Sequence, residues 1–211
     1  MGKHLLWIAA VILTGCMNTG LRTGDLAFVR AGAAPDSVSM SKAISSATGE
    51  VIHVAIVEVA DGGVWVIDAT DQRGVDRHPL DTLIADFTTR DGIPPSLEFK
   101  RLRNDWKVKA YIRKAKTLVG RPYDWYFSAD NDAYYCSELV WSCYEGVFPL
   151  RPMNFAADDG SYPAFWVELF DRLGCPIPQG APGTNPQDLY DNPALVPVSG
   201  KIPKPGAHPA P

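Results

Sequence analysis

The sequence has few histidines and cysteines, no excess of positive charge and no long hydrophobic run. Four His and four Cys occur among 211 residues without clustered zinc-type spacing, so we expect no metal site and no cofactor. The apolar run from Leu5 to Leu13 is too short to span a membrane stably. Because 20 Lys and Arg face 24 Asp and Glu, for a net charge of -4, nucleic acid is not an expected partner.

The composition is that of an ordinary globular domain. Hydrophobic residues make up 46% of the chain and charged residues 21%, which excludes a disordered chain and a polytopic membrane protein. At 211 residues, with no internal repeat, the chain is expected to form one domain with one active centre, and to be a monomer.

The N-terminus has the features of an export signal. Residues 1–15 combine the basic Lys3 with the apolar run, which predicts a signal peptide. The segment Leu13-Thr14-Gly15-Cys16 resembles the bacterial lipoprotein cleavage box. The resemblance implies removal of residues 1–15, acylation of Cys16 and a membrane-anchored lipoprotein in the cell envelope, on the periplasmic side, with the outer membrane favoured where one exists. The alternative is a plain secretory signal with an incidental Cys.

The rest of the chain divides into a linker (16–23), one domain (24–198) and a Pro-rich tail (199–211). Strands are predicted at 24–30, 53–59, 63–68 and 97–102, and helices at 40–47, 79–87, 106–119, 135–146 and 164–173. The Asp61-Gly62 pair predicts a hairpin turn between the second and third strands. Strands near the front, with helices before and after them, indicate an α+β fold.

Three cysteines remain in the domain once Cys16 is set aside. Cys143 and Cys175 could form a disulfide and leave Cys136 free, or they could be buried as small apolar side chains. The sequence leaves both alternatives open.

An active thiol needs a base, and few histidines are available. His4 leaves with the signal and His208 lies in the tail, which leaves His53 and His78. His53 opens a strongly β-forming run and is the preferred base. His78, in Arg77-His78-Pro79, is interpreted as an exposed loop residue.

Cys136 falls where a loop gives way to a predicted helix. Unpaired backbone N–H groups and the positive end of the helix dipole favour a thiolate there, and a nearby imidazolium adds to the effect. The same N–H groups are suited to stabilise the oxyanion of an acyl-transfer intermediate. Cys136 is therefore the candidate nucleophile.

A third group usually orients the imidazole in such a site. Asp68 ends the strand that should pair with the His53 strand, so its carboxylate is the preferred candidate. Glu138 is the rival, although an acid in the first turn of a helix can simply stabilise the helix dipole.

Six segments, taken in order, resemble one family. They are Gly24-Asp25-Leu26, His53-Val-Ala-Ile, Val66-Ile-Asp68-Ala, Gly74-Val75 followed by Pro79-Leu80, Gly120-Arg-Pro-Tyr-Asp124 and Tyr135-Cys-Ser-Glu-Leu-Val140. This set resembles the permuted papain-like hydrolases, the YiiX/YebB-like branch of the NlpC-type cysteine peptidase superfamily. The segment from Asn185 to Pro193 looks like that family's closing motif, so the resemblance covers residues 24–197.

The resemblance implies a circularly permuted papain-like fold, with an antiparallel sheet and the catalytic Cys at a helix N-terminus. It implies Cys136 as nucleophile and His53 as general base, and the family's third polar residue, usually Glu, falls on Asp68. That shorter side chain either orients His53 directly, acts through a water or weakens activity. The candidate substrate-binding or secondary residues are Tyr123, Asp124, Tyr135, Ser137 and Glu138.

Three functions follow from this resemblance. The first is an envelope cysteine hydrolase that cleaves amide bonds in peptidoglycan stem peptides or related amides through a Cys-His-Asp site. The second is a lipid acyl hydrolase or acyltransferase, and the third is an inactive envelope-binding module. A basic segment bears on the choice: nine of the 20 Lys and Arg lie between Lys100 and Arg121, either as a solvated helix face or as a contact for anionic lipid or peptidoglycan carboxylates.

Overall fold

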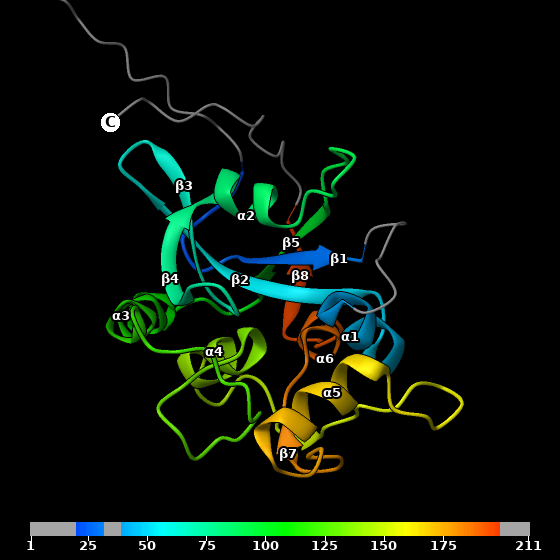
Figure 1. The fold of residues 1–211 in the computed structure, drawn as a ribbon. Helices are drawn as coiled ribbons and strands as arrows, with labels where there is room; N and C mark the ends of the chain where they lie inside the picture. Colours follow the sequence, from blue (N-terminus) through cyan, green and yellow to red (C-terminus); the bar gives the residue numbers. More distant parts are fainter. Residues whose placement is uncertain (1–19, 32–38, 199–211) are drawn as a thin grey trace, which may run out of the picture.

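The computed structural model describes residues 20–31 and 39–198 (Figure 1). The predicted signal peptide, Cys16, the first half of the linker (16–19) and the tail lie outside the described residues. Six helices are described, none of them long and apolar enough to cross a membrane among these residues: α1 (Met40–Thr48), α2 (Leu80–Asp86), α3 (Val108–Leu118), α4 (Cys136–Cys143), α5 (Ala164–Leu173) and α6 (Pro186–Tyr190).

An antiparallel sheet of six strands forms the centre of the fold. Its strands are β1 (Leu26–Arg30), β2 (Val51–Ala60), β3 (Gly63–Thr70), β4 (Gly74–Pro79), β5 (Ser96–Leu102) and β8 (Leu195–Pro197), in the spatial order β4-β3-β2-β1-β5-β8. A separate two-stranded ribbon pairs β6 (Arg151–Pro152) with β7 (Pro182–Gly183). The α+β prediction agrees with this architecture.

The β2–β3 hairpin turns as its sequence predicts. Ala60 pairs with Gly63, and the two residues between them have positive φ angles, 53° at Asp61 and 73° at Gly62. Positive φ at both central residues defines a type I′ turn, whose twist suits a two-residue hairpin. The turn therefore fixes the register that brings the two strands together.

Helices cover both faces of the sheet. α2 packs on one face through Leu80 and Leu83, while α3 and α4 pack on the other face through a cluster that includes Ile112 and Leu139 (Figure 1). A third, aromatic cluster joins α5 to the β6–β7 ribbon and to α1. Cys136 lies in the core cluster on the face covered by α3 and α4, and it lines a pocket together with His53 of β2.

Cys143 and Cys175 are both free thiols, so the disulfide alternative is not formed. Cys143 is buried on α4, as expected for a small apolar residue, and burial raises the pKa of its thiol to about 11. Cys175 is only partly buried.

Candidate active site

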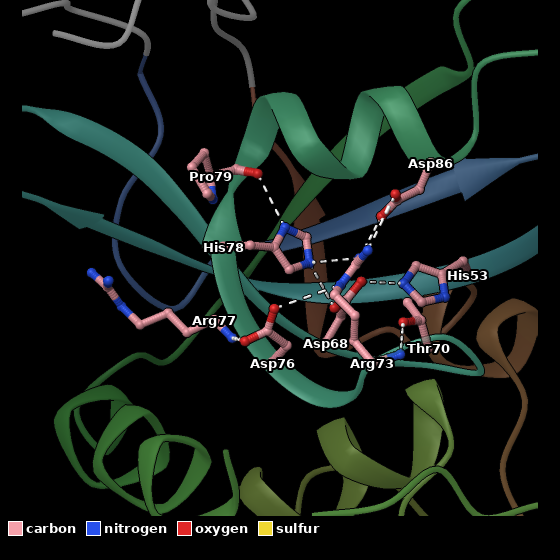
Figure 2. A network of polar contacts seen from close by, with 9 residues as sticks. All are labelled: His53, Asp68, Thr70, Arg73, Asp76, Arg77, His78, Pro79 and Asp86. Atoms are coloured by element: carbon pink, nitrogen blue, oxygen red, sulfur yellow. Dashed lines mark hydrogen bonds and ion pairs between the residues drawn. The ribbon is translucent and has the colours of Figure 1, made fainter. Parts of the chain in front are cut away.

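Two neighbouring strands place a histidine and an aspartate in contact. His53 lies on β2 and Asp68 on β3, and both side chains are buried. His53 Nε2 is 2.7 Å from Asp68 Oδ2, a direct hydrogen bond (Figure 2). The shorter side chain of Asp68 thus reaches the imidazole without an intervening water. Since an ionised carboxylate only accepts, Nε2 carries the hydrogen and Nδ1 is free to exchange a proton elsewhere.

Cys136 is the first residue of α4 and lies beside His53. Both line the same pocket, and their interaction raises the pKa of His53. Burial lowers the pKa of His53, but the negative charge of Cys136 and the hydrogen bond to Asp68 outweigh it and raise the value to about 10. The site therefore favours a protonated His53 beside the sulfur of Cys136.

The start of α4 provides hydrogen-bond donors beside the sulfur. The backbone N–H groups of Cys136, Ser137 and Glu138 stand in the first turn, where a helix has no carbonyl four residues back to accept them. Donors of this kind stabilise an oxyanion that forms on a carbonyl attacked by the adjacent sulfur. A candidate nucleophile, a candidate base and candidate oxyanion donors therefore lie together at the start of α4.

The Asp68 carboxylate has a second histidine partner that the sequence interpretation placed wrongly. His78 is not an exposed loop residue: it is 5% exposed, lies on β4, and its Nε2 is 3.0 Å from Asp68 Oδ1 (Figure 2). Burial raises the pKa of Asp68, but hydrogen bonds from His53 and His78 outweigh it and keep this carboxyl ionised, with its pKa well below the usual range. The polar sequence Asp76-Arg77-His78-Pro79 concealed a strand, because its polar side chains have partners inside the fold.

The Tyr123-Asp124 pair has two separate roles in the structure. Asp124 is buried and accepts hydrogen bonds from the backbone N–H groups of Tyr126 and Ser128 at 2.9 and 2.7 Å, which shapes the loop before α4. Tyr123 lines both pockets that meet at Cys136. Tyr123 is thus placed to contact a substrate, whereas Asp124 supports the loop.

The residues on either side of Cys136 are held by Thr184, which the sequence interpretation missed. The Thr184 N–H donates to the Tyr135 hydroxyl at 3.1 Å, and the Thr184 hydroxyl donates to Ser137 Oγ at 3.0 Å. Thr184 follows β7 in a Pro- and Gly-rich segment, and no local sequence signal marks it. Tyr135 and Ser137 are thus held in place by Thr184, and both also line the apolar pocket beside Cys136.

Glu138 stands in the first turn of α4, but a charge–dipole role does not describe it fully. It is 4% exposed and accepts a hydrogen bond from the Tyr135 N–H at 3.3 Å. Burial raises the pKa of Glu138 to about 8, and the nearby Asp124 charge adds to the effect. Its hydrogen-bond partner is the Tyr135 N–H, whereas the carboxylate that bonds His53 is that of Asp68.

Two pockets of different character adjoin Cys136. One, with a volume of about 50 Å³, has a mainly apolar lining that includes Phe127, Met153, Phe155 and Trp166. The other, of about 260 Å³, lies on the His53 side and includes Asp71 and Asp86. A substrate whose carbonyl carbon met the sulfur would extend into both.

The basic segment spans the end of β5 and all of α3. Its exposed residues on the helix include Lys109, Arg113 and Lys114, while Lys116 pairs with Glu58. This helix face is exposed, which both a solvated face and a contact for anionic lipid or peptidoglycan carboxylates would require.

Known proteins resemble this chain over nearly its whole length. The family model described as permuted papain-like amidase enzyme, YaeF/YiiX, C92 family matches residues 20–199. The uncharacterized protein YiiX of Escherichia coli (strain K12) is 27% identical over 210 residues, which cover 96% of this chain and 98% of that protein. A crystal structure of metalloprotein YiiX from Escherichia coli O157:H7 matches with a TM-score of 0.66 at 28% identity, covering 86% of this chain and 98% of that one.

The word metalloprotein describes that relative. In the present chain, residues 20–31 and 39–198 contain no group of three or more His, Cys, Asp and Glu side chains placed to hold a metal ion. The donor set of the described residues therefore does not fit an ordinary protein metal site.

Proposed function

The chain belongs to the permuted papain-like amidase family of the YaeF/YiiX type, and from this premise we propose that it is a cysteine hydrolase acting on amide bonds of the cell envelope. The expectation of a permuted papain-like fold is confirmed by the family match and by the likeness to the YiiX structure. One observation carries the catalytic assignment: His53 bonds Asp68 through Nε2 and interacts with the sulfur of Cys136 at the start of α4.

In the proposed reaction, the Cys136 thiolate attacks the amide carbonyl carbon and forms a tetrahedral oxyanion. The N–H groups of the first turn of α4 stabilise this oxygen. His53 transfers its Nδ1 proton to the leaving nitrogen, the C–N bond breaks, and the acyl group remains on sulfur as a thioester. His53 then takes a proton from water, whose oxygen attacks the thioester and releases the carboxylic acid and the thiolate.

The test is the full chain incubated with peptidoglycan fragments, with products identified by mass. Cys136→Ala should abolish turnover and labelling of that position by iodoacetamide at neutral pH. Cys143→Ala is the matched control, because it removes a buried thiol from the same helix without touching the pocket. Turnover that persists in Cys136→Ala would refute the assignment.

A second function draws support from the apolar pocket. Phe127, Phe155 and Trp166 form an aromatic lining next to Cys136, which suits an aliphatic acyl group better than a polar stem peptide. The same sulfur would then cleave or transfer a lipid acyl group. Phospholipids in the same assay distinguish the two: release of fatty acid, without cleavage of peptidoglycan fragments, favours the lipid substrate.

We also propose that the domain is tethered to an envelope membrane through an acylated Cys16. The support is the sequence alone: a basic start, a short apolar run and Leu13-Thr14-Gly15-Cys16. Incorporation of labelled palmitate into the wild-type chain, lost in Cys16→Ser, is the expected result. Equal incorporation in both chains would overturn the tether.

A further inference from the structure

Two histidines bind one buried carboxylate. Asp68 is 0% exposed, and its Oδ2 receives His53 Nε2 at 2.7 Å while its Oδ1 receives His78 Nε2 at 3.0 Å (Figure 2). Asp68 lies opposite Asp76 in the β3–β4 pairing, so His78, two residues further along β4, is its diagonal neighbour. The sheet register therefore aims both imidazoles at the same side chain.

The contacts of His78 determine its protonation state. Its Nδ1 is 3.1 Å from the carbonyl oxygen of Pro79, which can only accept a hydrogen bond. Its Nε2 faces the Asp68 carboxylate, which also only accepts. Both contacts are hydrogen bonds only if both ring nitrogens carry hydrogen. Arg73 Nη2, which can only donate, also lies 3.3 Å from Nε2, but the Asp68 oxygen is nearer at 3.0 Å, so the geometry favours an imidazolium. The electrostatics agree: burial lowers the pKa of His78, but Asp68 outweighs it and the pKa is raised.

The charges around His78 are consistent with this state. Arg73 Nη2 is 3.3 Å from His78 Nε2, yet the guanidinium is paired with Asp86 on α2, and its Nε is 3.5 Å from Asp76 on β4 (Figure 2). Three carboxylates, those of Asp68, Asp76 and Asp86, thus face Arg73 and two imidazolium rings. Arg73 is thus largely neutralised by Asp86 and Asp76, which leaves the Asp68 carboxylate to the two histidines.

From this geometry we propose that His78 is a positioning residue, which holds the Asp68 carboxylate as an imidazolium and shares its negative charge with His53. The proposal rests on the proposed function in so far as His53 and Cys136 are the reacting pair. With Oδ1 held by His78, the carboxylate cannot turn away from His53. With part of its charge neutralised, Asp68 stabilises the His53 imidazolium less, which leaves His53 able to give up its proton to a leaving group.

Two variants separate the two proposed roles of His78, which are the hydrogen bond to Asp68 and the positive charge. His78→Gln keeps an N–H donor near Asp68 Oδ1 and removes the positive charge, whereas His78→Phe removes both. In each variant the full charge of Asp68 acts on His53, so His53 should lose its proton about one pH unit higher than in the wild-type chain. His78→Phe should also slow alkylation of Cys136 and turnover about tenfold or more, and His78→Gln should restore most of that rate, since the carboxylate is again held.

The measurements are the protonation of the His53 and His78 ring nitrogens by ¹⁵N NMR, and the rate of iodoacetamide alkylation of Cys136 against pH. In the wild-type chain both nitrogens of His78 should carry hydrogen through pH 6–8. A singly protonated His78, or an unchanged His53 titration in His78→Gln with only thermal stability lowered, would overturn the proposal. The wild-type spectrum decides even where His78→Phe fails to fold.

Neither readout needs a substrate, so a shifted His53 titration in a chain that cleaves no amide would refute the proposed function and leave this proposal standing.

Discussion

The hydroxyls of Thr184 and Ser137 are joined by a buried hydrogen bond of 3.0 Å, which ties the first turn of α4 to the segment after β7. Ser137 follows the candidate nucleophile directly, and Thr184 lies 47 residues further along the chain. Because Thr184 N–H also binds the Tyr135 hydroxyl, both neighbours of Cys136 are fixed by one distant residue. The position of the sulfur thus depends on a contact outside its own helix.

Thr184→Val tests this dependence, since valine has nearly the same shape but no hydroxyl. We expect a loss of about 1–2 kcal/mol in the free energy of unfolding, because Ser137 Oγ loses a buried partner, together with slower alkylation of Cys136. Thr184→Ser keeps the hydroxyl and is the control. Urea unfolding of both variants checks the expectation, and equal stability of the valine and serine variants would contradict it.

Glu138 gives a prediction with a defined pH window. Burial raises its pKa in the folded chain to about 8, above the ordinary value of 4.5, so the folded state favours the neutral acid. The stability associated with this group is therefore full below pH 4.5 and decreases as the pH rises towards 8. Glu138→Gln removes that ionisation and retains an oxygen that accepts the Tyr135 N–H.

The Glu138→Gln variant should therefore gain stability over the wild-type chain at pH 8.5, by about 1 kcal/mol or more, with a smaller difference at pH 5. Urea titrations of both chains at the two pH values measure this difference. A difference that does not change with pH would show that the carboxyl titrates normally.

Local patterns were enough to predict the elements that carry the site. Two β-forming runs and the Asp61-Gly62 pair between them predicted the hairpin of β2 and β3, and the helical period predicted α3 and α4. These signals work because a strand that is covered on both faces, as β2 is, needs a continuous apolar run, whereas α3 buries one face and repeats its apolar residues at the helical period. They placed His53, Asp68 and Cys136 on elements that the structure brings together.

Contacts between distant polar residues had no such signal. The strand β4 has few buried apolar residues, so its sequence has the appearance of a loop. Its polar residues have partners inside the fold instead, Arg77 with Glu58 and His78 with Asp68. Asp25 was placed only within the predicted strand at 24–30, and its buried pairing with Arg101 had no signal in the sequence. Such pairings depend on sheet order, which the sequence of one strand does not specify.

Gly74 provides a prediction about the backbone beside the site. Its φ is +65°, and a Cβ there would lie 2.3 Å from the carbonyl oxygen of Arg121. That carbonyl accepts the N–H of Val75 at 2.8 Å, which holds the segment leading to Tyr123 against β4. Gly74→Ala should therefore lower the free energy of unfolding by about 2–4 kcal/mol, from backbone strain and the steric clash together.

Gly92→Ala is the matched control for Gly74→Ala. Gly92 has a φ of +78°, but a Cβ there would meet nothing within 4 Å. Gly92→Ala should lower the free energy of unfolding only through backbone strain, by about 1 kcal/mol. Urea unfolding of both variants isolates the clash as the difference between them, and equal losses would contradict the close approach of Arg121.

The raised pKa of His53 should make the stability of the protein depend on alkaline pH. The pKa of His53 is raised in the folded chain to about 10, above its ordinary value of 6.5. A base whose pKa is raised by folding contributes stability that is complete below pH 6.5 and is lost as the pH rises through 10. His53→Gln abolishes this contribution, so the variant should be much less stable than the wild-type chain at pH 6. The difference in the free energy of unfolding between the two chains should narrow towards pH 10, by at most about 1.4 kcal/mol per pH unit. Titrating groups that are not coupled to His53 are present in both chains and cancel in the difference. A constant difference from pH 6 to pH 10 would mean that His53 is not protonated in the folded protein.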